Sequence, residues 1–145
     1  MLTKILAGSV FATALLIGGC SSDDSGSKAP TKDEYITEAD EVCTDWDKKV
    51  DALGEPEFTD AGIEKFADEI SQSLRDLTTD LRKITPPTAD ADKLNSGYDA
   101  VDDWADELDS VTTFDEFSAS VDPKGVEDLE NYGFKVCFKD DESMG

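Results

Sequence analysis

The chain has 145 residues, of which 35 are acidic and 13 are basic, so its formal net charge is −22 at pH 7. Binding to nucleic acid, or to anionic lipid through the protein surface, depends on clusters of lysine and arginine, so this balance argues against both kinds of partner. Histidine is absent, which removes the common zinc sites, histidine pH switches and nucleophilic schemes that use a histidine base.

The first residues have the pattern of an export signal. Lys4 supplies a positive charge, and residues 5–17 are an unbroken run of apolar and small side chains. This run fits the hydrophobic core of a secretory signal and is shorter than the roughly 20 residues that span a bilayer. The following Gly18-Gly19-Cys20 resembles the end of the lipobox of bacterial lipoproteins. The resemblance implies cleavage before Cys20 and a diacylglyceryl group, with palmitate as its acyl chain, on the thiol. A plain secretory signal with a chance cysteine is the alternative.

We therefore expect four segments. Residues 1–19 are the signal peptide, residues 20–31 a lipidated flexible tether, residues 32–138 a folded domain and residues 139–145 an acidic tail. Serine, glycine and aspartate dominate the tether, which is typical of flexible linkers. Cleavage removes one base, Lys4, and no acid, leaving 12 bases against 35 acids and a net charge of −23. The expected location is the extracytoplasmic face of the cell membrane, where the lipid anchors the protein.

Two long helices are expected in the first half of the mature chain. The first covers residues 32–53, because Thr31 and Glu34 form a capping box and apolar side chains follow at helical spacing. The second runs from its N-cap, Thr59, to Ile84, where two prolines stop it. The apolar positions are Tyr35, Ile36, Ala39, Val42, Cys43, Trp46, Val50 and Leu53, then Ile63, Phe66, Ala67, Ile70, Leu74, Leu77, Leu81 and Ile84.

A third long helix and shorter elements follow. The third helix is expected from Thr88, as its cap, to Ser110, with one face almost entirely of aspartate and glutamate. A second capping box, Thr113 to Glu116, opens a short element, and Asp122-Pro123 opens a last helix that ends at Gly133. No convincing strand pattern or internal repeat is evident. The predicted fold is all-α: an antiparallel bundle of three long helices plus one or two short C-terminal helices, closed by one disulfide.

The expected disulfide joins Cys43 and Cys137, an even pair in an exported chain. Cys43 lies on the apolar side of the first helix, and Cys137 lies between Phe134 and Phe138 in an apolar segment that needs a surface to cover. The bridge closes a loop of about 94 residues, which the chain-entropy model values at ~4–5 kcal/mol. Two separate buried thiols are the alternative.

Three short motifs carry a family resemblance. They are Ala39-Asp40-Glu41-Val42-Cys43, Leu81-Arg82-Lys83-Ile84-Thr85-Pro86-Pro87, and Tyr132-Gly133 followed by Cys137. The chain resembles the small two-cysteine, all-helical lipoproteins common in Actinobacteria, and the resemblance covers nearly all of the mature chain. It implies a fold, a disulfide and a location in the cell envelope rather than a chemical activity.

No catalytic, cofactor-binding or metal-ligating residues are identified. Carboxylate pairs are unavoidable in so acidic a chain, so a solvated helix face accounts for them better than acid–base catalysis. Residues 90–101 have part of a calcium-loop pattern but carry Val101 where the bidentate glutamate belongs. Weak, nonspecific divalent-cation association with the third helix stays open. Trp46 and Trp104 fall on apolar helical faces, which favours core packing over a sugar-binding platform.

These observations favour a non-catalytic module that is anchored in the membrane and presents an acidic surface to an envelope protein. The alternative is a small-ligand carrier with an apolar cavity inside the bundle. An enzyme without histidine is the third and least favoured class. No cofactor is expected, and the oligomeric state is left open.

Overall fold

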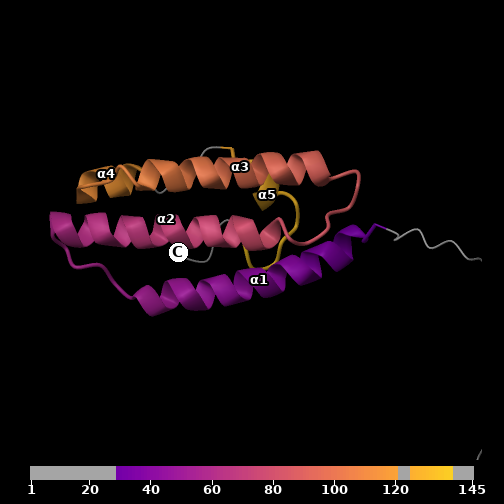
Figure 1. The fold of residues 1–145 in the computed structure, drawn as a ribbon, viewed down its shortest axis with the longest axis horizontal. Helices are drawn as coiled ribbons and strands as arrows, with labels where there is room; N and C mark the ends of the chain where they lie inside the picture. The colour runs from indigo at the N-terminus through magenta and orange to yellow at the C-terminus, as the bar shows by residue number, and fades with distance from the viewer. Residues whose placement is uncertain (1–28, 121–124, 139–145) are drawn as a thin grey trace, which may run out of the picture.

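The computed structural model describes residues 29–120 and 125–138, which contain helices and no strand. The helices are α1 (Lys32–Leu53), α2 (Asp60–Leu81), α3 (Ala91–Leu108), α4 (Phe114–Ala119) and α5 (Glu127–Glu130). Figure 1 shows α1, α2 and α3 side by side along one axis, with each running opposite to the helix before it. Helix α4 packs against α2 at the end of the bundle where α1 joins α2, and α5 packs against α3.

Helix α1 has the predicted bounds, and the predicted capping box forms at its start. The Glu34 amide donates to the Thr31 hydroxyl at 3.3 Å, and the Thr31 amide donates to the Glu34 carboxylate at 2.8 Å. These bonds satisfy amides that have no partner within the helix. Gly54 follows with φ 71°, a conformation that favours glycine, and the chain turns there toward α2.

Three predicted helix boundaries were wrong by a few residues: the end of the second helix and both ends of the third, which stops at Leu108 rather than Ser110. Helix α2 stops at Leu81 rather than Ile84, because the last amides bond three residues back, with Ile84 donating to the Leu81 carbonyl at 3.1 Å. These three-residue bonds form a tighter last turn. The proline pair follows, and a proline disfavours helical geometry in the residue that precedes it. Helix α3 begins at Ala91, because Thr88 lies in a turn closed by the Asp90 amide and the Pro87 carbonyl at 3.0 Å.

The C-terminal elements are shorter than expected. The predicted capping box of Thr113 and Glu116 forms at the start of α4. The predicted helix start at Asp122-Pro123 lies outside the described residues. The described helix, α5, is a single turn, and Gly133 follows it with φ 107°. A Cβ atom at Gly97 of α3 would lie 2.6 Å from a methyl carbon of Leu129, so the missing side chain at this position lets α5 approach α3.

One continuous hydrophobic core joins the helices to the C-terminal segment. Its buried members are Tyr35, Ile36, Ala39, Cys43, Ile63, Ala67, Leu74, Leu77, Leu81, Leu94, Tyr98, Val101, Ala105, Leu108, Val111, Val126, Leu129, Tyr132, Phe134 and Cys137. Most of the predicted apolar positions of the long helices are among them. The core is therefore built from α1, α2 and α3 and closed by the segment that carries Cys137.

Candidate functional site

The predicted lipidation site, Cys20, and nearly all of the tether lie outside the described residues. None of the helices in the described part of the chain combines the length and the apolar character needed to cross a membrane. The lipid anchor on Cys20 therefore stays a prediction.

The predicted disulfide between Cys43 and Cys137 is present, with Cα atoms 5.4 Å apart. The neighbouring Asp40 of α1 holds the same segment through its carboxylate, which accepts the Lys135 amide at 2.9 Å and the Val136 amide at 3.1 Å. Bonds from backbone amides to a carboxylate are charge-assisted and stronger than neutral ones. A covalent bond and a polar clamp thus fix the C-terminal segment to one turn of α1.

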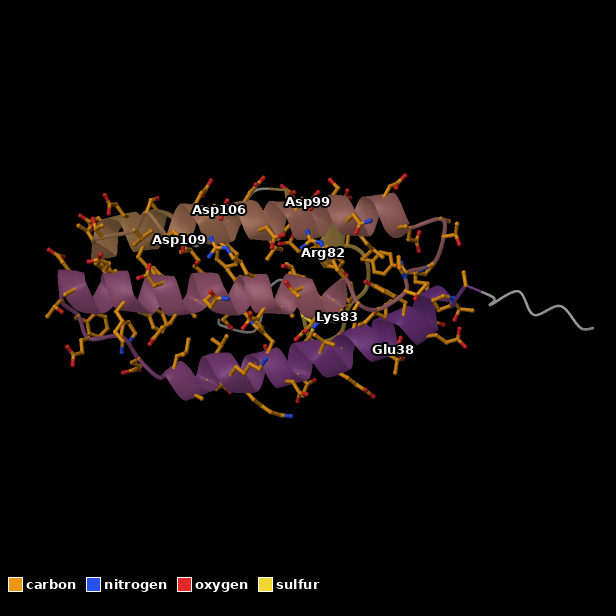
Figure 2. All side chains as sticks on the ribbon, viewed as in Figure 1. Glu38, Arg82, Lys83, Asp99, Asp106 and Asp109 are labelled. Atoms are coloured by element: carbon orange, nitrogen blue, oxygen red, sulfur yellow. A yellow bond between two sulfur atoms is a disulfide. The ribbon has the colours of Figure 1, made fainter. Side chains whose placement is uncertain are left out.

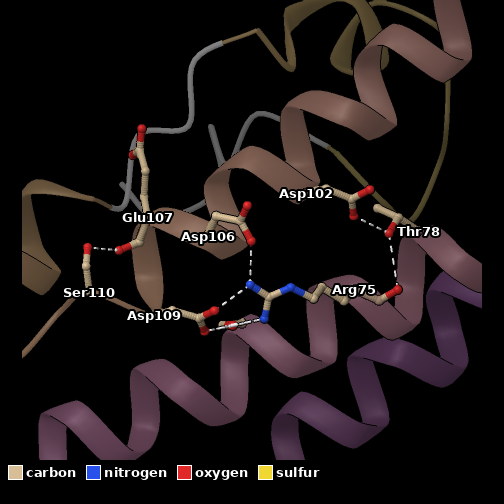
Figure 3. Close-up of polar contacts among 8 residues, drawn as sticks. Arg75, Thr78, Asp102, Asp106, Glu107, Asp109 and Ser110 are labelled. Carbon is tan, nitrogen blue, oxygen red and sulfur yellow. Dashed lines mark hydrogen bonds and ion pairs between the residues drawn. The ribbon is translucent and has the colours of Figure 1, made fainter.

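Arg75 of α2 lies at the centre of a polar cluster that connects α2 to α3 (Figure 3). Its guanidinium donates to Asp106 at 2.6 Å, to Asp109 at 2.5 Å and to the Ser71 hydroxyl at 2.5 Å. The Ser71 side chain is buried and donates in turn to Asp109. A buried hydroxyl group is therefore satisfied by a carboxylate that is itself paired with arginine.

A similar arrangement recurs seven residues later on α2 and seven residues earlier on the antiparallel α3. Arg82 donates to Asp99 and to Asp102, both at 2.7 Å, and the buried Thr78 hydroxyl donates to Asp102 at 2.5 Å. Figure 2 shows Arg82 reaching from α2 toward α3, from which Asp99 comes. We call the two clusters together the α2–α3 seam; it consists of Ser71, Arg75, Asp106 and Asp109, and of Thr78, Arg82, Asp99 and Asp102.

The electrostatics of the seam indicate a structural role. Hydrogen bonds from Arg75, and then from Ser71, lower the pKa of Asp109 below its usual value. The same contacts with Asp109 and Asp106 raise the pKa of Arg75. Both partners are therefore charged near neutral pH, and neither is poised to exchange a proton. Because the Asp109 side chain is 47% exposed, solvent screens the pair, and the seam orients α2 against α3 more than it stabilises the fold.

Three tyrosines form a buried polar group at the end of the bundle where α1 begins. The Tyr35 and Tyr98 hydroxyls lie 2.5 Å apart, and the Tyr132 hydroxyl donates to Asp90 at 2.8 Å. The Tyr35 and Tyr132 rings meet edge to face with centroids 6.1 Å apart. Burial, and then the hydrogen bond with Tyr35, raises the pKa of Tyr98. These phenols stay protonated at neutral pH and supply packing and hydrogen bonds.

The two tryptophans pack against the core, as predicted. The Trp46 indole donates to the Ser73 carbonyl at 3.1 Å, and the Trp104 indole donates to the Ser120 carbonyl at 2.5 Å. Each ring thus joins two elements of the fold rather than forming an open platform.

Part of the acidic face of α3 is paired with arginines of α2. Four of its carboxylates belong to the seam, and Asp90 accepts a tyrosine hydroxyl. Within residues 29–120 and 125–138, no group of three or more Cys, Asp or Glu residues is arranged to hold a metal ion.

The bundle has surface pockets at its helix ends. A pocket of about 270 Å³ lies at the connection between α1 and α2, and another of about 360 Å³ lies between the end of α3 and α4. The first is lined by Leu53, Glu55, Pro56, Glu57, Thr59, Ala61, Gly62, Lys65, Phe66 and Glu69. The first volume is below, and the second just above, the lower end of the ~300–1,000 Å³ that is typical of small-molecule sites.

Two exposed aromatic side chains lie at the same end of the molecule. Phe58, in the α1–α2 connection, is 78% exposed, and Phe114, the first residue of α4, is 53% exposed. Their ring centroids lie 6.3 Å apart. In the described part of the chain they are the large hydrophobic side chains with high exposure. We call this pair the aromatic tip.

Three of these features are not among the predictions from the sequence: the clamp at Asp40, the repeat in the α2–α3 seam and the exposed position of Phe58. The seam can be found by searching for a hydroxyl residue four positions before an arginine, repeated after seven residues. Phe58 is detectable as a large apolar residue that belongs to no helical stripe and lies between acidic residues.

Comparisons of the chain with family models, with curated proteins and with solved structures found no match.

Proposed function

We propose that the protein is an extracytoplasmic lipoprotein, anchored through Cys20, that acts as a non-catalytic interaction module of the cell envelope. The folded part presents an acidic surface to a protein partner. In this proposal the working unit is an antiparallel bundle of three long helices followed by one or two short ones. The resemblance to the two-cysteine helical lipoproteins of Actinobacteria supports the same location.

The observation that carries the proposal is the excess of carboxylates over bases on the folded surface. The ion pairs among the described residues engage six basic side chains and eight carboxylates. The chain as a whole has 35 acids and 13 bases. Carboxylates thus far outnumber bases, and a surface of one sign attracts a partner of the opposite sign over a Debye length of about 8–10 Å.

The polar groups in the interior support a non-catalytic role. The buried Ser71 and Thr78 hydroxyls donate to Asp109 and Asp102, and these carboxylates are paired with arginine. Groups arranged in this way hold helices together.

The experiment is co-isolation from the native envelope. The tagged protein is crosslinked in cells, solubilised in detergent and purified in dilute buffer and in about 0.5 M NaCl, where the Debye length is several-fold shorter. A Cys20→Ala variant is the control for the anchor. We expect the native protein to fractionate with membrane and to retain a defined protein that high salt releases, and we expect the variant to leave the membrane. No retained protein, or retention independent of salt, contradicts the proposal.

The pocket at the α1–α2 connection keeps a small-ligand carrier as the second candidate. Its lining combines apolar groups of Leu53, Pro56 and Phe66 with Glu57 and Lys65. Native mass spectrometry of the purified protein tests this function, because a carrier retains a bound small molecule of defined mass. A mass equal to that of the lipidated chain alone contradicts the carrier function.

A further inference from the structure

The aromatic tip is fixed rather than loosely exposed. A second aromatic contact joins α2 and α4: the Phe66 and Phe117 rings meet at an angle of 63° with centroids 5.7 Å apart. Residue 62 is glycine, and a Cβ atom there would collide with the backbone of Glu57, beside Phe58. The α1–α2 connection is therefore pressed onto the first turn of α2, and Phe58 is held in its exposed position.

Phe114 is held equally firmly from the other side. The capping box of Thr113 and Glu116 fixes the start of α4, and the Glu116 carboxylate also accepts the Thr112 amide at 2.9 Å. Hydrogen bonds from Thr112, and then from Thr113, lower the pKa of Glu116, so this carboxylate stays ionised and keeps accepting. Two exposed rings from separate elements are thus presented in contact, in a preorganised arrangement that reduces the entropic cost of binding.

The charged residues next to Phe58 and Phe114 in the sequence are acidic. Glu55, Glu57 and Asp60 flank Phe58, and Asp115 follows Phe114. None of these four carboxylates takes part in an ion pair among the described residues, in contrast to the carboxylates of the α2–α3 seam. An apolar pair with an acidic rim is complementary to an apolar group with a basic rim.

We propose that the aromatic tip is the docking site for a basic amphipathic segment of an envelope protein, whose apolar side chains cover Phe58 and Phe114 and whose lysines or arginines meet the surrounding carboxylates. The inference rests on the proposed function and names its contact surface. A second copy of this chain brings a second acidic rim, and an anionic membrane brings negative headgroups, so charge repulsion disfavours both occupants. The tip lies at the opposite end of α1 from the residue that follows the tether (Figure 1), which leaves it free while the protein is anchored.

The test uses the mature protein in nanodiscs of zwitterionic lipid and three dye-labelled helical peptides of equal length. One peptide combines lysine with leucine, one combines lysine with serine, and one combines glutamate with leucine. Fluorescence anisotropy measures binding, and the signal from empty nanodiscs is subtracted. We expect the Lys/Leu peptide to bind most tightly, and Phe58→Ser/Phe114→Ser to weaken it about tenfold or more, because burial of even one phenylalanine exceeds the free energy of a tenfold change. Binding of the Lys/Ser peptide should change less than about threefold.

Charge variants provide a matched control. Glu55→Gln/Glu57→Gln should weaken binding of the Lys/Leu peptide, whereas Glu38→Gln/Glu41→Gln removes the same charge from the first half of α1, where Figure 2 labels Glu38, and should have a smaller effect. Equal effects of the two pairs, or no effect of the phenylalanine variant, overturn the proposal. A concentration-dependent dimer that Phe58→Ser/Phe114→Ser abolishes also overturns it, because the occupant is then a second copy.

The same phenylalanine variant separates this inference from the proposed function. If the variant retains the envelope partner in the co-isolation experiment as well as the native protein does, the docking site is wrong and the proposed function stands. If neither protein retains a partner, the proposed function itself fails.

Discussion

Removal of the Cys43–Cys137 bridge is expected to lower the free energy of unfolding by about 2–5 kcal/mol. The bridge joins residues 94 positions apart, and the chain-entropy model assigns about 4.7 kcal/mol to a loop of this size. Such a loss is a large part of the roughly 5–15 kcal/mol that stabilises a typical domain. Cys43→Ala and Cys137→Ala remove the same bond, so the double variant should lose little more than either single variant.

Asp40 of α1 provides a second variant that tests how the C-terminal segment is held. Its carboxylate accepts the Lys135 and Val136 amides, so Asp40→Ala leaves two amides without their charged acceptor and should cost about 1–3 kcal/mol. The adjacent Glu41→Ala is the matched control, because Glu41 is exposed and accepts no such bond, and it should change stability by less than about 0.5 kcal/mol.

The assay is urea unfolding followed by circular dichroism, with and without reductant. Mass spectrometry of the nonreduced protein should show two hydrogens fewer than the reduced protein. If the two cysteine variants lose independent amounts that add in the double variant, or if reductant leaves the unfolding free energy unchanged, the reasoning about a shared stabilising bond is refuted.

Three further predictions concern packing and charge. Gly97→Ala should cost a net 1–2 kcal/mol or so, because overpacking against Leu129 outweighs the gain in helix propensity; equal urea midpoints contradict this. The pKa of Asp109 is lowered in the fold, so its contribution is present above the unfolded value of about 3.9 and is lost as the pH falls through the folded value. The stability difference between native protein and Asp109→Asn should therefore shrink below about pH 4, and a constant difference contradicts the assignment. The melting temperature should rise as NaCl increases to about 0.5 M, because salt screens the net charge of the mature chain, −23 (12 bases and 35 acids); a flat or falling trend indicates local compensation.

The sequence was sufficient for the all-helical fold, the disulfide and both capping boxes. Each has a local or pairwise signal: apolar residues at helical spacing, two cysteines in an exported chain, and threonine three residues before glutamate. The wrong helix ends have a different cause. Thr88 is a good N-cap by type, but the turn from Pro87 to Asp90 occupies that position, and local sequence does not show which of two polar residues the chain will use.

The contacts between helices were beyond the sequence interpretation. Arg75 pairs with Asp106 and Asp109, and Arg82, seven residues later, pairs with Asp99 and Asp102, seven residues earlier. The hydroxyl–arginine half of this repeat is local to α2, but its partners on α3 follow only from the antiparallel register. The role of Asp40 depends on a segment 95 residues away. The aromatic tip combines Phe58 and Phe114 from separate elements, and their joint exposure follows from tertiary packing.

The most direct test of the account is photo-crosslinking in the native envelope from residue 58. A benzophenone-bearing phenylalanine replaces Phe58 in the anchored protein, and the same group at Glu38 is the control near the opposite end of α1. The account predicts a discrete adduct from residue 58 with one envelope protein, mapped by mass spectrometry to a segment rich in lysine or arginine, and a much weaker adduct from residue 38. Equal adducts from both positions, an acidic crosslinked segment, or no protein adduct from residue 58 contradicts the central claim that the acidic bundle meets its partner through the aromatic tip.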